Sequence, residues 1–170
     1  MLENKLGITD STELARMEER ISKQKALEMF ESGFFETLEP GTYKSLAMIH
    51  QCLFDEIYDF AGKLRKVNIS KGNFRFAPLM YLETALQNID KMPQSTFDEI
   101  VEKYVEMNVA HPFREGNGRS TRIWLATVYK GNIIKNLIMD CQSYTKYRPN
   151  ETTGGIFVSW RRKEELPTGA

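Results

Sequence analysis

The chain has 170 residues, and its 23 Lys and Arg balance 23 Asp and Glu, so the formal net charge is 0. This length fits one domain, and a composition of 41% hydrophobic and 27% charged residues is typical of a folded protein rather than a disordered one. The balanced charge argues against a general nucleic-acid binder, which carries a basic excess. No apolar run is long enough to span a membrane, and the polar, acidic N-terminus does not resemble a secretory signal.

The N-terminal part of the chain is predicted to form two helices. Asp10 followed by Glu13 has the spacing of a capping box, which opens the first helix. Ser22 is predicted to cap a second helix, which ends at Gly33.

The spacing of apolar residues predicts two further helices. Residues 46–57 place large apolar side chains at helical spacing, and this helix is predicted to end near Gly62. Pro78 fits the first turn of the next helix, because the N–H that proline lacks has no helical partner there. Pro93 ends that helix.

A further helix is predicted to begin at Thr96, where Glu99 completes a second capping box. Its apolar residues recur with the period of a helix and are predicted to face the core. They are Phe97, Ile100, Val101, Tyr104, Val105 and Val109.

Residues 67–77 do not follow helical spacing. Two short alternating runs flank Lys71-Gly72-Asn73, which is the pattern of a β-hairpin. A lone hairpin is marginal in water unless it packs on something, so we expect it to lie on the helices. The fold class expected is therefore an all-α helical bundle with one short β-hairpin.

The residues that can carry chemistry are concentrated in residues 111–122, HPFREGNGRSTR. Pro112 disfavours helical geometry at His111, so we expect a helix, a tight loop and another helix. The glycines of the Gly-Asn-Gly run tolerate positive φ, which lets backbone N–H groups converge on an anion at a helix N-terminus. Arg119 and Arg122 share one face of that helix and can bind phosphate bidentately. The sequence therefore predicts a polyphosphate site.

Two side chains beside this loop suggest a reaction. Glu115 is placed to hold Mg²⁺ against phosphates. His111, with an ordinary pKa of about 6.5, can take a proton from an incoming hydroxyl. Phe113 is predicted to anchor the loop inward. Each feature alone is more typical of an ordinary turn, a solvated helix face or a structural histidine, and His50 is expected to be structural.

Residues 111–122 match, at every signature position, the pattern HxFx(D/E)GNGRxxR, and the chain thereby resembles the Fic family. The resemblance extends over about residues 41–138. It includes residues 58–62 with Arg65, and a flap hairpin that in this family binds the target protein. The flap residues are Asn68, Ile69, Ser70, Lys71 and Gly72.

The resemblance implies that the chain is a cytoplasmic, Mg²⁺-dependent protein adenylyltransferase. Such an enzyme transfers AMP from ATP to a Ser, Thr or Tyr hydroxyl and releases pyrophosphate. The implied roles are His111 as general base, Glu115 as Mg²⁺ ligand, Gly116, Asn117 and Gly118 as anion hole, Arg119 on the β-phosphate and Arg122 on the γ-phosphate. The flap would bind the target by strand addition.

Several alternatives stay open. Gly118 favours AMP transfer over phosphorylation, because the kinase-like relative Doc has Lys there, but a Doc-like phosphotransferase is the second hypothesis. A weakly active nucleotide-binding remnant and a purely helical scaffold are the others. ATP is the default donor, and the target is either another protein or this chain itself. Neither nucleic acid nor membrane is an expected partner, and a homo-oligomer is an open question.

Three segments are predicted: an N-terminal helical segment (1–40), a Fic core (41–138) and a divergent tail (139–170). The tail shows no helical stripe, and we expect a C-terminus that is truncated or altered by a frameshift. Cys52 and Cys141 lack metal-ligand spacing and a disulfide framework, so they are expected to be reduced thiols of a cytoplasmic protein.

Small Fic proteins of this type carry an inhibitory helix, (S/T)xxxE(G/N), whose glutamate pairs with the second signature arginine, here Arg122. The chain has no match, because residues 9–14 and 32–37 end in Leu and Thr. Loss of this helix predicts unregulated activity, whereas loss of core helices predicts misfolding or weak activity.

Overall fold

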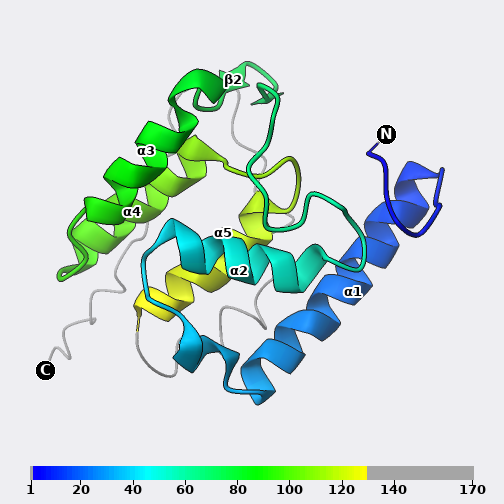
Figure 1. The fold of residues 1–170 in the computed structure, drawn as a ribbon, viewed down its shortest axis with the longest axis horizontal. Helices are drawn as coiled ribbons and strands as arrows, with labels where there is room; N and C mark the ends of the chain where they lie inside the picture. The colour runs from blue at the N-terminus through cyan, green and yellow to red at the C-terminus, as the bar shows by residue number, and fades with distance from the viewer. Residues whose placement is uncertain (1, 130–170) are drawn as a thin grey trace, which may run out of the picture. The chain divides into compact units, whose positions relative to one another are not determined.

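The computed structural model describes residues 2–129, and the predicted tail and Cys141 lie outside them. The described elements are α1 (Ser11–Glu31), a 3-10 turn η1 (Phe34–Thr37), α2 (Tyr43–Phe54), β1 (Ser70–Lys71), β2 (Phe74–Arg75), α3 (Leu79–Lys91), α4 (Phe97–Ala110) and α5 (Asn117–Val128) (Figure 1). These elements confirm the all-α class with one hairpin. Within the described part of the chain, no helix is long and apolar enough to cross a membrane.

Helix α1 is one continuous helix of 21 residues. The Asp10 side chain caps it by accepting from the Glu13 N–H at 2.7 Å, as predicted. The predicted break at Ser22 is wrong, because that hydroxyl donates to the Glu19 carbonyl inside the helix. The buried stripe Leu14, Glu18, Ser22, Ala26 and Met29 passes through the position without a shift of phase. Packing therefore overrides the local capping preference.

Helix α2 packs against α1, α3 and α5 (Figure 1). Its residues Leu46, Ile49 and Phe54 are completely buried, and each such side chain stabilises the fold by about 1.5–3 kcal/mol. Trp124 on α5 is also buried, and its indole N–H donates to the Thr42 carbonyl at 2.8 Å. This bond joins the start of α2 to the helix that follows the signature loop.

The predicted capping box of α4 is present at Thr96 and Glu99. The predicted core stripe is wrong in part, because Phe97 is 54% exposed whereas the charged Lys103 is buried. The Lys103 ammonium donates to the Met92 carbonyl and to Gln94 Oε1 just beyond the end of α3. A cation at a helix C-terminus satisfies carbonyls that the helix leaves unpaired, which explains how a lysine can occupy this buried face.

The hairpin lies within the predicted residues 67–77. A two-residue turn joins its strands, and Gly72 takes the positive φ of 57° that such turns require at their first position. The Ala77 N–H donates to the Val109 carbonyl at 3.0 Å, and the Asn68 amide oxygen accepts from the Leu79 N–H at 2.7 Å. The hairpin is thereby attached to α3 and α4, as expected.

Candidate active site

Helix α4 ends at the histidine of the signature. His111 has φ 49°, and no other non-glycine residue of the described chain has a positive φ. This confirms that Pro112 turns the chain away from the helix here. A non-glycine residue in the left-handed region costs about 1–2 kcal/mol, and such strained positions cluster at functional sites.

The ring of His111 is fixed in one orientation. Its Nδ1 lies 3.2 Å from the Asn108 carbonyl oxygen. A carbonyl only accepts, so Nδ1 carries the hydrogen and Nε2 keeps its lone pair. Phe76, which follows β2, stacks on the ring with centroids 3.7 Å apart. Burial, with smaller contributions from the positive charges of Arg65 and Lys71, lowers the pKa of His111 to about 4, although that hydrogen bond acts to raise it. The imidazole is therefore a neutral base.

The loop after His111 is held by the side chain of Asn117. The Asn117 amide oxygen accepts from the Phe113 N–H at 2.9 Å, and its NH₂ donates to the Phe113 carbonyl at 2.7 Å. Phe113 is completely buried, as predicted. Since the Asn117 side chain is fully used inside the loop, the group of Asn117 that remains available to an anion is the backbone N–H.

The two glycines of the loop serve different purposes. Gly116 is the N-cap of α5 with φ 77°, and a Cβ there would lie 2.5 Å from a ring carbon of the buried Phe54. Its N–H donates to the Glu115 carboxylate at 2.9 Å. Gly118 is helical, so only one of the two glycines uses positive φ. A Cβ at Gly118 would lie 3.5 Å from Nη1 of Arg122, so this glycine lies directly beside the second signature arginine.

The two signature arginines have different surroundings. Arg119 forms an ion pair with Glu18 on α1, donates to the Ser22 hydroxyl at 3.2 Å and lies 4.9 Å over the Phe54 ring. The second Glu18 oxygen accepts from the Tyr58 hydroxyl. Helix α1 therefore orients Arg119, a contact that sequence reasoning did not find.

Arg122 has a buried Nε that lacks a hydrogen-bond partner among the described residues. Unsatisfied buried polar groups are rare in folded proteins. The guanidinium of Arg122 is therefore suited to an anionic ligand.

His50 is structural, but it acts on the signature loop. Its Nδ1 accepts from the Gly62 N–H at 2.9 Å, so its Nε2 carries the hydrogen and donates to the Glu115 carbonyl at 2.8 Å. The ring stacks on Phe113 with centroids 3.8 Å apart. Burial lowers the pKa of His50 to about 4, against the Glu115 hydrogen bond. Its helical spacing alone gave no sign of this loop contact.

Both histidines are expected to stay neutral through the physiological range. A ¹H NMR titration of the C2–H resonances should show no histidine charging between pH 5.5 and 8, and His111→Ala assigns the two signals. The unfolded rings bind protons below about pH 6.5 and the folded ones do not, so the free energy of unfolding falls as the pH drops from 6.5 towards 4. A folded His111 signal that titrates near 6.5 would contradict the burial argument.

The predicted flap residues have two different surroundings: some bond to the rest of the fold, and others lie on the exposed edge of the hairpin. The Asn68 amide oxygen accepts from the first N–H of α3, whereas Ser70, Lys71 and Gly72 are exposed without such a role. The Phe76 N–H donates to the Ile69 carbonyl, so the neighbouring Ser70–Arg75 pair is a non-hydrogen-bonded one. The backbone N–H and C=O of Ser70 therefore point outward and can accept an added strand.

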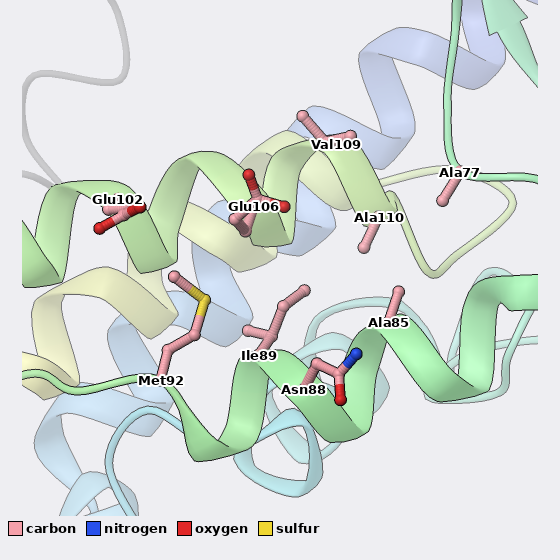
Figure 2. A pocket seen from close by; sticks show the side chains of 9 residues that line it. All are labelled: Ala77, Ala85, Asn88, Ile89, Met92, Glu102, Glu106, Val109 and Ala110. Atoms are coloured by element: carbon pink, nitrogen blue, oxygen red, sulfur yellow. The ribbon is translucent and has the colours of Figure 1, made fainter.

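A separate pocket of about 320 Å³ lies between α3 and α4 (Figure 2). Apolar side chains such as Ile89, Met92 and Val109 line it together with Glu102 and Glu106. None of the predicted site residues lines this pocket.

A helical bundle with a hairpin and the loop HPFREGNGRSTR is the architecture expected from the sequence, and comparison with known proteins confirms the family. Residues 40–129 match the Fic/DOC family, and the chain belongs to it.

Its curated relatives include the "Protein adenylyltransferase VbhT" of Bartonella schoenbuchensis, 32% identical over 134 residues, which are 71% of this chain and 27% of that protein. The "Probable protein adenylyltransferase Fic" of Salmonella typhimurium is 30% identical over 139 residues, which are 73% of this chain and 65% of that protein. The chain therefore spans less than two thirds of both relatives.

Solved structures share the fold. BepA, a type IV secretion system effector, superposes with a TM-score of 0.63 at 24% identity, covering 76% of this chain and 52% of that one. BepC from Bartonella tribocorum, solved with bound AMPPNP, has a TM-score of 0.60 at 18% identity and covers 85% of this chain and 86% of that one.

Proposed function

We propose that this chain transfers AMP from ATP to a Ser, Thr or Tyr hydroxyl of a target protein and releases pyrophosphate. The observation that carries the proposal is the orientation of His111, whose neutral Nε2 is kept as an acceptor beside a loop that ends at a helix N-terminus. The printed names of the relatives, protein adenylyltransferases, support the same activity.

In this mechanism Nε2 of His111 takes the proton of the target hydroxyl while its oxygen bonds to the α-phosphorus of ATP. The bond from that phosphorus to the oxygen bridging to the β-phosphate breaks, and pyrophosphate leaves. The backbone N–H groups of Asn117 and Gly118 bind the phosphate oxygens at the start of α5, and that of Gly116 joins them once the Glu115 carboxylate turns from it to the metal ion. Arg119, oriented by Glu18, binds the β-phosphate, and Arg122 binds the γ-phosphate.

The residues present fit a magnesium ion that arrives with the nucleotide. Among the described residues, no three His, Cys, Asp or Glu side chains gather into an all-protein metal site. Mg²⁺ is usually bound by one or two carboxylates together with substrate phosphates, and Glu115 is an exposed carboxylate beside the anion-binding loop. Glu115 would hold the ion, which would neutralise charge on the α- and β-phosphates.

The target would bind as an added strand at the outward-facing backbone of Ser70, with Lys71 and Gly72 beside it. The target is an unidentified protein, either a different chain or a second copy of this one. We place the reaction in the cytoplasm, where the thiols of Cys52 and Cys141 are expected to stay reduced.

Labelled ATP tests this function in a cell lysate. Protein label from α-³²P-ATP is the expected result, and His111→Ala should abolish it. Label from γ-³²P-ATP alone would instead assign a Doc-like phosphotransferase. A rise in melting temperature with ATP and Mg²⁺ but no labelled protein would indicate a nucleotide-binding remnant. If ATP and Mg²⁺ did not change the melting temperature either, the chain would be a helical scaffold.

A further inference from the structure

Arg65 is a buried cation whose hydrogen-bond partners are all carbonyl oxygens. Only 3% of the surface of Arg65 is exposed to solvent. Nε donates to the His111 carbonyl at 2.9 Å, and Nη1 donates to the Val67 carbonyl at 2.7 Å. Nη2 donates to the carbonyls of Ala77 and Ala110. One guanidinium thus contacts three separate segments of the chain.

These segments are the ones that a target reaction must align. Val67 and Ala77 are the two ends of the hairpin, and Ala110 and His111 are the last residue of α4 and the proposed base. The Arg65 N–H also donates to the Pro112 carbonyl at 2.8 Å. Arg65 therefore joins both ends of the flap to the backbone that carries the imidazole.

The energetics favour a geometric role. Burying a guanidinium without a carboxylate carries a desolvation cost, and burial lowers the pKa of Arg65. Carbonyls at the C-terminal end of α4 partly offset this cost, because that end of a helix dipole is negative. Arginine fits because its donors project in a fixed planar fork, whereas a lysine ammonium is a single point that cannot reach oxygens spread around such a fork.

We propose that Arg65 is a positioning residue, which sets the distance between a target strand at Ser70 and Nε2 of His111. This proposal rests on the proposed function, but it also predicts a structural coupling that can be measured without turnover. The flap has other attachments, namely Ala77 to Val109 and Asn68 to Leu79. Losing Arg65 should therefore shift the flap rather than release it.

The kinetic test compares Arg65→Lys with the unaltered chain, using the main protein labelled by α-³²P-ATP in the lysate as target. Small misplacements of reacting groups cost about 10²-fold in rate, so we expect a loss of roughly 10- to 100-fold in kcat/KM for the target. The Kd for ATP with Mg²⁺, measured by calorimetry, should change less than about 2-fold. Equal losses in ATP affinity and in transfer would overturn the proposal.

A double-mutant cycle separates positioning from general stability. Ser70→Pro removes the outward N–H of the flap edge, so in that background Arg65→Lys should add little further loss. If the two substitutions instead lowered kcat/KM by factors that multiply in the double variant, Arg65 would not act through the flap. The matched control is Lys103→Met, which removes another buried cation bonded to carbonyls, here the ones at the end of α3 rather than those of the hairpin. It should lower the melting temperature and leave target transfer unchanged.

The structural test needs no target. Stacking of Phe76 displaces the His111 C2–H resonance by ring current, and Arg65→Lys should move this signal towards its unstacked position. An unchanged signal in folded Arg65→Lys protein would refute the coupling, whatever the outcome for AMP transfer. If Arg65→Lys does not fold, Arg65→Gln replaces it, because a neutral amide leaves no buried charge unpaired.

Discussion

His111→Ala is expected to lower the rate of AMP transfer by about 10²–10⁴-fold, the usual loss when a general base is removed. The reason is specific to the geometry. Asn108 holds the hydrogen on Nδ1, and burial keeps the ring neutral, so Nε2 is an available base at every pH in the physiological range. The measurement is single-turnover transfer from α-³²P-ATP to the lysate target, with the Kd for ATP measured alongside.

The control for this substitution is His111→Asn. Asparagine tolerates the left-handed conformation at φ 49° better than alanine does, yet it cannot accept the proton. Both variants should therefore lose transfer equally, while the melting temperature separates backbone strain from chemistry. A loss of less than 10-fold with normal ATP binding would mean that another group is the base.

Glu18→Gln is expected to lower the midpoint of thermal unfolding by about 10 °C, because breaking a buried ion pair costs roughly 3 kcal/mol. Glu18 is buried, and its two oxygens bind Arg119 and Tyr58. The neutral amide removes the Glu18 carboxylate charge from the Arg119 guanidinium. Weaker ATP binding should accompany the loss, because the same arginine is proposed to hold the β-phosphate. Calorimetric unfolding and ATP titration measure the two effects.

Glu19→Gln is the matched control, because its carboxylate is one position away on the same helix. Glu19 pairs with Lys23 at 2.7 Å, and both side chains are well exposed. Exposed pairs contribute about 0–1 kcal/mol, so this variant should melt close to the unaltered protein. Equal changes in melting temperature for Glu18→Gln and Glu19→Gln would show that the buried pair contributes no more to stability than the exposed pair does.

The sequence correctly predicted the features that depend on residues close together in the chain. Pro112 ended α4 at His111, the capping box opened that helix, and Gly72 marked the turn of the hairpin. Ser22 and Phe97 were predicted wrongly because tertiary packing, not local preference, decides which helix face is buried.

The contacts that hold the site residues in place could not be predicted from the sequence, because each contact joins positions far apart in the chain. Arg65 bonds to carbonyls up to 46 residues away, His50 to Glu115 across 65 residues, and Arg119 to Ser22 across 97. One signal was available for Glu18, since it lies in phase with the apolar stripe of α1 where a charged residue needs a partner. That partner lies in the signature, so the N-terminal segment, predicted as separate from the core, completes the proposed site.

The buried Nε of Arg122, which has no hydrogen-bond partner within residues 2–129, has a consequence for stability. A buried donor left unsatisfied costs about 1–3 kcal/mol, so this group lowers the free energy of unfolding. A phosphate that accepts from this group would restore the loss, and a ligand at a hundred times its Kd adds about 2.7 kcal/mol. On the proposed function, ATP would then stabilise the folded protein as well as serve as its substrate.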